Sequence, residues 1–342
     1  SSRLLVHYLQ EQKIPSSIVD ARAVMTTSNE FTEAVPLFDI IEQKAKQLLL
    51  PPLEKGSVVV TQGFVGSTKE GITTTIGRGG SDYSAAIFGS VLNAEEIQIW
   101  TDVDGILTAD PSIVSEARRI KVMTFNEAAE LAYFGAKVLH PATILPAIQK
   151  NIPVRVLNSR RPEGEGTLIA EQSHSKSDCV VKSIAYKEGI TVIGIQSTRM
   201  LMAHGFLARV FDLFERHKKS IDVVATSEVG ISLTVDNKSH VEEIVEELSK
   251  FAEVVVESQR AVFCVVGERM KLTKGVAARV FHALAQADVN IELISQGGSE
   301  INLSFVVDET DIDRTVRSLH QEFFSDDLDS GDLFEVIPAN AL

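Results

Sequence analysis

The chain has 342 residues, of which 44% are hydrophobic and 23% are charged, and its formal net charge is −14. This composition is typical of a globular protein with two or three domains and excludes the disordered and fibrous classes. The acidic excess repels phosphate backbones and anionic lipid, so nucleic acid and membrane surfaces are excluded as main partners. Two cysteines are too few for a disulfide framework or a four-cysteine zinc site, and they suit a reducing cytoplasm, where we expect the protein to act.

Residues 1–169 alternate short β-rich runs with amphipathic helical segments, which predicts an α/β layer with a largely parallel sheet. A polar run at residues 171–178 lacks apolar periodicity and predicts a linker. The predicted strands are Ser17–Asp20, Ser57–Gln62, Ile97–Thr101 and Pro153–Leu157, and the predicted helices are Leu37–Leu50, Asp82–Leu92, Thr124–Phe134 and Ala142–Gln149.

The second half of the chain repeats itself with an offset of 70 residues. Gly205–Leu233 aligns without a gap with Gly275–Leu303, and the same offset aligns Thr191–Gln196 with Ala261–Val266. Each copy has the pattern of a strand, a helix, two strands and a second helix, which predicts two ferredoxin-like βαββαβ units in series. We expect these units to be small ligand sensors that pair through their sheets.

The strongest candidate for anion binding is Thr73–Ser84, with the sequence TTTIGRGGSDYS. Hydroxyl groups, a guanidinium, glycine backbone N–H groups and the start of a helix near Ser81 come together there, as they do where proteins hold anions. Arg78 is the natural clamp for a carboxylate or a phosphate. The alternative is structural: Ser81 and Asp82 cap a helix and the glycines form a turn.

Two further segments carry groups suited to ligand binding. In Trp100–Pro111, a predicted strand ends at Thr101, Asp102 and Asp104, and carboxylates at the carboxyl end of a parallel strand lie where open α/β sheets bind ligands. The same residues would also suit an ordinary glycine turn. In Gly135–Pro141, Lys137 and His140 follow a helix, where a lysine is commonly a solvated charge at the helix C-terminus.

Several long motifs resemble those of aspartate kinases, and the repeat resembles the paired ACT domains of that family. The resemblance covers essentially the whole chain, and residues 200–236 are similar to the lysine-inhibited, single-function type. The motifs, in chain order, are TQGFVG (61–66), TTTIGRGGSDYSAA (73–86), IWTDVDGILTADP (99–111), FNEAAELAYFGAKVLHPATILPA (125–147) and IPVRVLNS (152–159).

The resemblance implies a kinase that transfers phosphate from ATP, with Mg²⁺, to the side-chain carboxylate of L-aspartate. Arg78 would clamp the aspartate, and Gly79, Gly80 and Ser81 would line its site. The catalytic residues implied are Asp82, which would orient lysines, and Lys137. The implied nucleotide-binding residues are Thr101, Asp102, Leu107, Ser112, Lys137 and Val138.

For regulation, the resemblance implies that L-lysine binds between ACT domains of two subunits and inhibits the enzyme. Asp222 and Glu228 would pair with the ammonium groups, because they are the carboxylates of the set. The second domain has Glu292 at the position of Asp222 but glycines at those of Ser227 and Glu228, so we expect one effector-binding domain. The implied effector residues are Met200, Ala203, Phe206, Leu207, Ser220, Ile221, Asp222, Thr226, Ser227 and Glu228.

The resemblance also divides the chain. It implies the C-terminal part of an amino-acid kinase domain at 1–172, a linker at 173–182, a first ACT domain at 183–257, a second at 258–328, and an acidic tail at 329–342. The Lys-Phe-Gly-Gly strand that carries a catalytic lysine in the family is absent from this sequence. We therefore expect these 342 residues alone to be inactive. Two alternatives remain, namely an amino-acid kinase acting on glutamate or N-acetylglutamate, and a catalytically silent lysine-binding regulatory chain.

Overall fold

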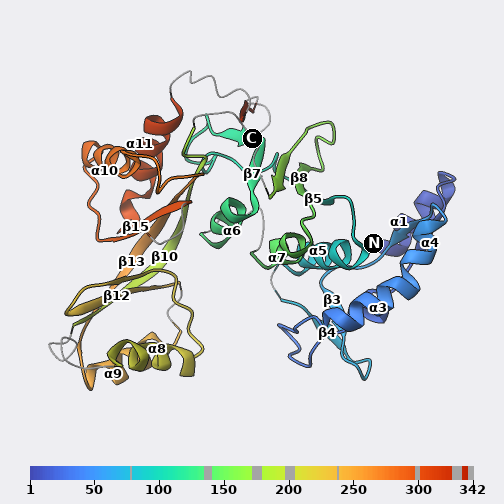
Figure 1. Cartoon of the computed structure of the whole chain (residues 1–342), viewed down its shortest axis with the longest axis horizontal. Coiled ribbons are helices and arrows are strands. Elements are labelled where there is room, and N and C mark those ends of the chain that lie inside the picture. Colours follow the sequence, from blue (N-terminus) through green and yellow to red (C-terminus); the bar gives the residue numbers. More distant parts are fainter. Residues whose placement is uncertain are drawn as a thin grey trace. The chain divides into compact units, whose positions relative to one another are not determined.

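The computed structural model divides the chain into two compact units, which we describe separately (Figure 1). The first unit comprises Ser1–Ile106, Arg119–Tyr133 and Lys137–Ser175, and the second comprises Leu107–Arg118, Phe134–Ala136 and Lys176–Leu342. The structure describes residues 1–77, 79–134, 141–171, 179–196, 205–236, 239–296, 301–325 and 333–337. Among these, no helix combines the length and the apolar character needed to cross a bilayer.

The first unit is an α/β assembly built from short sheets and the helices that pack beside them. The predicted strand Ile97–Thr101 is confirmed with the same bounds, and it pairs in parallel with Val154–Asn158. Its helices are α1 (Ser2–Glu11), α2 (Ala21–Val24), α3 (Phe38–Leu48), α4 (Leu50–Glu54), α5 (Gly80–Leu92), α6 (Phe125–Tyr133) and α7 (Pro141–Lys150). Its strands are β1 (Ser16–Ile18), β2 (Val58–Val60), β3 (Val65–Ser67), β4 (Thr73–Thr75), β5 (Ile97–Thr101), β7 (Val122–Thr124), β8 (Val154–Asn158) and β9 (Thr167–Ala170), and β6 (Arg118–Ile120) begins in the second unit.

In the described part of the first unit, the strands other than β6 form three sheets. β1 pairs with β2 in parallel, and β3 pairs with β4 antiparallel. The largest sheet has the order β5-β8-β9-β7, in which only the β8–β9 pair is antiparallel. The carboxyl ends of β5 and β8 therefore meet at one edge, which is where an open α/β sheet presents side chains to a ligand.

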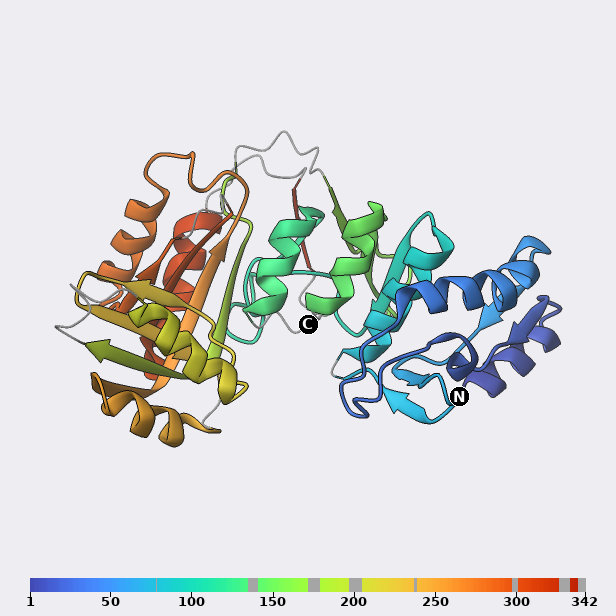
Figure 2. The same ribbon diagram turned by 60° about the horizontal axis from the view of Figure 1, so that its bottom comes forward.

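Helices α3, α5 and α7 lie side by side in the first unit (Figures 1 and 2). Ile41 and Ala45 of α3, and Ile87 and Val91 of α5, are spaced four residues apart, so each pair lies on one buried face. The predicted helix Leu37–Leu50 is confirmed over Phe38–Leu48, and a separate short helix, α4, begins at Leu50. The proline pair that follows Leu50 lies in the first turn of α4, where the missing N–H donors cost nothing.

In its described residues, the second unit contains a six-stranded sheet and four α-helices. Figure 1 shows α8 (Phe206–Arg216) and α9 (Val241–Ser249) at one end of the sheet, and α10 (Val276–Gln286) and α11 (Ile312–Phe324) at the other. A short 3-10 helix covers Glu309–Asp311. The strand order is β11-β12-β10-β13-β15-β14. The strands are β10 (Ser183–Gln196), β11 (Val224–Thr226), β12 (Gly230–Val235), β13 (Glu253–Val266), β14 (Leu293–Ser295) and β15 (Asn302–Asp308). A further strand, β16 (Phe334–Val336), lies outside this sheet and pairs with β6.

The two repeats interleave through the long strands β10 and β13. The second half of β10 pairs with β12 and with the start of β13, which completes the first repeat. The first half of β10, Ser183–Lys187, pairs with Val262–Val266 of β13, beside β15 of the second repeat. The repeat alone predicts units in series, and the pairing adds that residues before the first repeat supply a strand beside the second.

Two segments outside the predicted domains are part of this unit. Val181 and Lys182, in the expected linker, are buried, and the Lys182 N–H donates to the carbonyl of Val266. The expected acidic tail contains Phe334, which is buried with its ring 5.6 Å from that of Phe324. The apolar pair at Leu333 and Phe334 explains the difference, since the hydrophobic effect favours burial of such side chains despite the acidic neighbours.

Phe214 and Phe211 on α8 test the packing of the first repeat. Phe214 is 2% exposed within the cluster that includes Ile193, Leu233 and Ile244, whereas Phe211 is 39% exposed. We predict that Phe214→Ala lowers the free energy of unfolding of this unit by about 3 to 5 kcal/mol, because it leaves a cavity. Phe211→Ala should cost less than about 1 kcal/mol. Urea unfolding of both variants measures this, and equal losses would contradict the assigned faces.

Candidate functional site

Gly79, Gly80 and Ser81, the described residues of the predicted aspartate site, lie at the N-terminus of α5. The helix begins at Gly80, and its N-cap is Gly79 with a φ of 69°, so Ser81 and Asp82 lie in the first turn and are not the cap. The interpretation that they merely cap the helix is therefore wrong. An acidic residue in the first turn is favoured by the helix dipole, and a helix N-terminus suits an anionic ligand, although the N–H of Gly80 itself donates to the carbonyl of Gly77 at 3.1 Å.

Close packing explains the glycines and fixes the neighbouring turn of TQGFVG. A Cβ atom on Gly80 would lie 2.8 Å from the ring of Phe64, and one on Gly63 would lie 3.0 Å from the Cα atom of Ser81. The Phe64 N–H donates to the Ser84 hydroxyl at 2.9 Å, and that hydroxyl donates to the carbonyl of Gly80 at 2.6 Å. Two motifs that are separate in the sequence therefore form one local structure at the start of α5.

The predicted nucleotide residues Thr101 and Asp102 lie at the carboxyl end of β5. The side chain of Asp102 is exposed, and the Thr101 hydroxyl donates to it at 3.3 Å. Ser159, which follows β8, donates to the carbonyl of Thr101 from its N–H at 2.8 Å and from its hydroxyl at 2.9 Å. The turn after β8 is thus attached to the end of β5.

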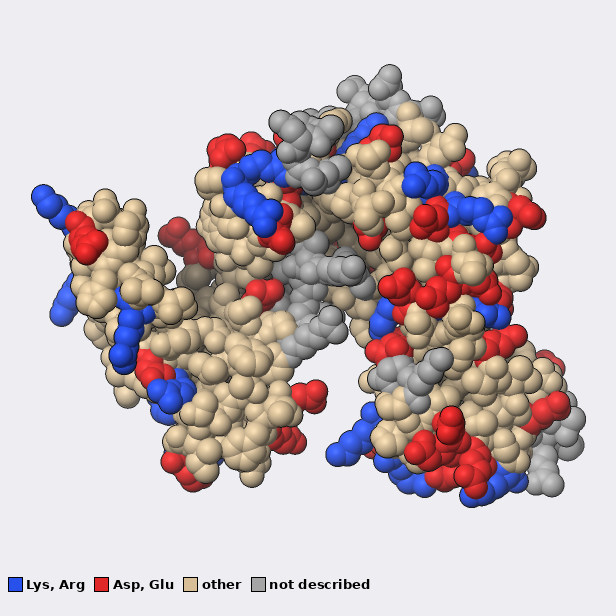
Figure 3. All heavy atoms as spheres, turned by 180° about the vertical axis from the view of Figure 1, so that it is seen from behind, with Lys and Arg blue, Asp and Glu red and all other residues tan. Residues whose placement is uncertain are grey.

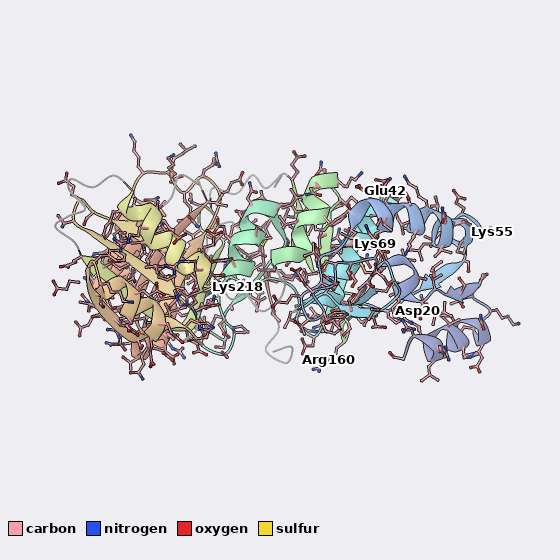
Figure 4. The ribbon with its side chains drawn as sticks, turned by 90° about the horizontal axis from the view of Figure 1, so that it is seen from below. Asp20, Glu42, Lys55, Lys69, Arg160 and Lys218 are labelled. Atoms are coloured by element: carbon pink, nitrogen blue, oxygen red, sulfur yellow. The ribbon has the colours of Figure 1, made fainter. Side chains whose placement is uncertain are left out.

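The side chain of Asp104 connects the turn after β5 to residues at and after the end of β8. Its carboxylate accepts from the Asn158 side-chain amide at 2.9 Å and pairs with Arg161. Burial lowers the pKa of the nearby Arg119, and the carboxylates of Glu165 and Asp104 oppose that shift. The sequence pattern did not identify Asn158 and Arg161 as site residues, although their position just after a parallel strand was a usable signal. Figure 4 shows Arg160, which is exposed, at the edge of the first unit.

The other two described nucleotide residues, Leu107 and Ser112, lie in a segment that packs within the second unit. The segment comprises Leu107–Arg118 and is called the connector below. Ser183 of β10 donates its hydroxyl to the carbonyl of Leu107 at 2.8 Å, and the Ile184 N–H donates to the carbonyl of Thr108 at 2.8 Å. The structure therefore groups Thr101 and Asp102 with the first unit, and Leu107 and Ser112 with the second.

Some predicted residues lie outside the described part of the chain, and the roles assigned to them stay predictions. These are Arg78, Lys137, Val138, Met200 and Ala203, together with His140 of the Gly135–Pro141 segment and Gly297 and Gly298 of the second repeat.

The described effector residues occupy the first repeat. Phe206 and Leu207 begin α8 after Gly205, which has a φ of 85°. Thr226, Ser227 and Glu228 are exposed at the hairpin between β11 and β12, where the Ser227 N–H donates to the carbonyl of Gly230. Figure 3 shows acidic side chains gathered at this end of the second unit, and exposed glutamates of α9 lie there. Such a surface attracts a cationic ligand.

Asp222 differs from Glu228 in its surroundings. Its side chain is 3% exposed, and Lys187 of β10 lies 3.5 Å from it and 3.2 Å from Asp236. Burial lowers the pKa of the neighbouring Lys219, and Asp236 and Asp222 oppose that shift. A ligand ammonium at Asp222 would therefore compete with a cation of the protein itself.

The second repeat has the same arrangement with a stronger internal partner. Glu292, at the position of Asp222, pairs with Arg260 of β13, and the same guanidinium lies 3.1 Å from Asp308. A guanidinium bonds a carboxylate in a fixed geometry that a lysine does not match. Glu292 thus already has a guanidinium partner within the chain.

Comparison with known proteins identifies the class. Residues 1–158 match the amino acid kinase family, and residues 263–323 match an ACT domain. The chain is 40% identical over 332 residues to the lysine-sensitive aspartokinase 3 of Escherichia coli, and it is also 40% identical over 348 residues to the chloroplastic aspartokinase 1 of Arabidopsis thaliana. The chain therefore belongs to the aspartokinase family.

Solved structures agree with this assignment. The crystal structure of E. coli aspartokinase III with aspartate and ADP, described as the R-state, matches 94% of this chain with a TM-score of 0.83. The T-state structure with lysine and aspartate gives 0.77. The chain spans 73% of the length of the E. coli protein and 60% of that of the Arabidopsis protein.

His320 provides a test of how the connector is held. It is buried on α11, with Nε2 3.2 Å from the hydroxyl of Thr108 and its ring 4.9 Å from that of Phe324. Burial lowers the pKa of His320 below its usual 6.5, Arg118 lowers it further, and Glu116 opposes the shift.

Because the folded state disfavours the protonated imidazole, we predict that stability is highest above about pH 6.5 and falls as the pH decreases from there. His320→Gln should lose less stability than the unchanged protein between about pH 7 and about pH 5. Urea unfolding at several pH values measures this, with the exposed His7→Gln as the control. Parallel curves for His320→Gln and the unchanged protein would contradict the prediction.

Proposed function

We propose that the protein phosphorylates the side-chain carboxylate of L-aspartate with ATP to give 4-phospho-L-aspartate, and that L-lysine inhibits it through the first ACT domain. The observation that carries the proposal is the joint structure at the start of α5, where the TQGFVG turn packs against Gly80, Ser81 and Ser84. The same motifs occur in the right order along a chain 40% identical to an enzyme whose structure holds aspartate and ADP.

The proposed chemistry needs alignment and charge neutralisation more than covalent help. Arg78 clamps the aspartate, with Gly79, Gly80 and Ser81 around it, and Asp82 orients the lysines near the transferred group. Thr101, Asp102, Leu107 and Ser112, with Lys137 and Val138, hold the nucleotide. Lys137 also stabilises charge on the phosphates.

Mg²⁺ accompanies ATP in this proposal. In proteins it binds mainly through substrate phosphates and one or two carboxylates, and the exposed Asp102 at the end of β5 is a carboxylate of that kind. When bound, the ion neutralises charge on the phosphate oxygens.

Self-association through the ACT domains completes the effector site in this proposal. The sheet of the second unit ends on both sides in three-residue strands, β11 and β14. The exposed hairpin that carries Ser227 and Glu228 follows β11. A second copy of the chain that covers this exposed hairpin would complete the effector site.

Arg78→Lys tests the aspartate clamp in an active form of the protein. A lysine offers a point charge in place of the bidentate guanidinium. We therefore predict that kcat/KM for aspartate falls about 5- to 150-fold, which corresponds to a loss of about 1 to 3 kcal/mol of transition-state stabilisation. ADP release coupled to aspartate measures this, and unchanged aspartate kinetics would contradict the clamp.

We expect the 342 residues alone to give no turnover, because they lack the family's Lys-Phe-Gly-Gly strand. Robust turnover by them would refute that expectation.

Calorimetry tests the proposed lysine site without any need for turnover. We predict that L-lysine binds the chain, that Glu228→Ala weakens binding at least about tenfold because an ammonium loses its carboxylate partner, and that Glu246→Ala on α9 has no effect. Equal affinity in Glu228→Ala, or no heat from lysine, would remove this site. Tighter binding of threonine would replace lysine as the effector. Lysine binding without kinase activity in any longer form would favour a regulatory chain.

A further inference from the structure

The connector is held to the six-stranded sheet of the second unit by a third contact, besides those of Ser183 and Ile184. The hydroxyl of Tyr186 on β10 donates to the Oδ2 atom of Asp110 at 3.3 Å. The Oδ1 atom of the same carboxylate accepts from the N–H of Ser112 at 2.9 Å and from its hydroxyl at 2.6 Å. Asp110 therefore links β10 directly to Ser112, one of the proposed nucleotide residues.

Tyr186 is itself held in place. Its ring stacks on that of Phe263 of β13 at 5.5 Å, and Phe263 stacks on Phe305 of β15 at 5.4 Å, with both phenylalanines fully buried. Burial, assisted by the charge of Asp110, raises the pKa of Tyr186 to about 12, so the phenol stays protonated and donates at neutral pH. Because stacking holds the ring, the Tyr186 hydroxyl oxygen has a fixed position, and its hydrogen bond restrains Asp110.

The next residue on the strand faces the effector site. Successive side chains of a strand point to opposite faces, and Lys187 pairs with Asp222 and Asp236. Two adjacent residues of β10 thus contact the proposed lysine-binding carboxylate on one side and the connector on the other. A ligand ammonium that binds Asp222 competes with Lys187, and the effect acts on the strand that holds Asp110.

We propose that Tyr186 is a positioning residue for the nucleotide-binding segment, and that the Lys187–Tyr186 pair of β10 transmits occupancy of the lysine site to the connector. This inference rests on the proposed function, because it takes Ser112 as a nucleotide contact and Asp222 as an effector contact. The inference goes beyond the proposed function because it names the residues of this chain that couple the effector site to the nucleotide-binding segment.

Hydrogen–deuterium exchange tests both parts of the inference on the 342-residue chain, with L-lysine as the probe. In Tyr186→Phe without ligand, amides of residues 107–118 should exchange about 3- to 10-fold faster than in the unchanged protein, the range expected for loss of one hydrogen bond. Tyr8→Phe, at a tyrosine that is 58% exposed, is the matched control and should not change them. Exchange as slow as in the unchanged protein would overturn the positioning role.

The coupling is tested by adding lysine. In the unchanged protein, lysine should slow exchange around Asp222 and accelerate exchange of residues 107–118 at least about threefold. In Tyr186→Phe, the protection around Asp222 should remain while the response of residues 107–118 disappears. An equal response in Tyr186→Phe, or none in the unchanged protein, would overturn the coupling. Absence of protection around Asp222 would instead show that the lysine site itself is misassigned, and the coupling would fall with it.

An active form of the protein gives an independent measure of positioning. Tyr186→Phe should raise the KM for ATP about 3- to 10-fold and leave the KM for aspartate unchanged, because only the nucleotide segment is touched. Equal changes in both constants would indicate general destabilisation and would contradict the assigned role.

Discussion

The pairing of the long strand β10 with β13, which is interrupted by register shifts between Lys187 and Val192, is the constraint on which the second unit depends. The strand bonds to β13 on one side along nearly its full length, and in its second half it also bonds to β12 on the other. Its first half, Ser183–Lys187, lies beside the second repeat, while its second half is the core strand of the first. Register shifts between Lys187 and Val192 divide this ladder, so Tyr186 and Lys187 lie together in the regular first half of β10, beside the second repeat.

A comparable constraint organises the first unit at the carboxyl ends of β5 and β8. Parallel pairing places Thr101 opposite Asn158, and the contacts of Ser159 with Thr101 and of Asn158 with Asp104 then join the two following turns. Glycine is required where the turns approach the sheet most closely. A Cβ atom on Gly105, whose φ is 130°, would lie 2.4 Å from the hydroxyl of Thr167. The proposed nucleotide residues therefore stand on a turn whose backbone has few alternatives.

Local pattern was sufficient for the elements that depend on neighbouring residues. The strand Ile97–Thr101 and the helix beginning near Ser81 follow from periodicity and composition, and the family resemblance is confirmed by the relatives. Contacts between distant residues could not be predicted in this way. Asp104 and Asn158 are 54 residues apart, and Asp110 and Tyr186 are 76 apart, so only folding brings them together. The sequence repeat likewise did not predict that Ser183–Lys187 pairs beside the second repeat.

The most direct test of the account is the linkage between the two ligands in a form of the protein that binds both. Titration calorimetry of ADP, with and without saturating L-lysine, gives the coupling free energy between the sites, and lysine titrated with and without ADP must give the same value. If β10 joins the effector site to the nucleotide segment, lysine weakens ADP binding by about 5- to 150-fold and ADP weakens lysine binding by the same factor. Identical ADP affinities in the presence and absence of bound lysine would contradict the account.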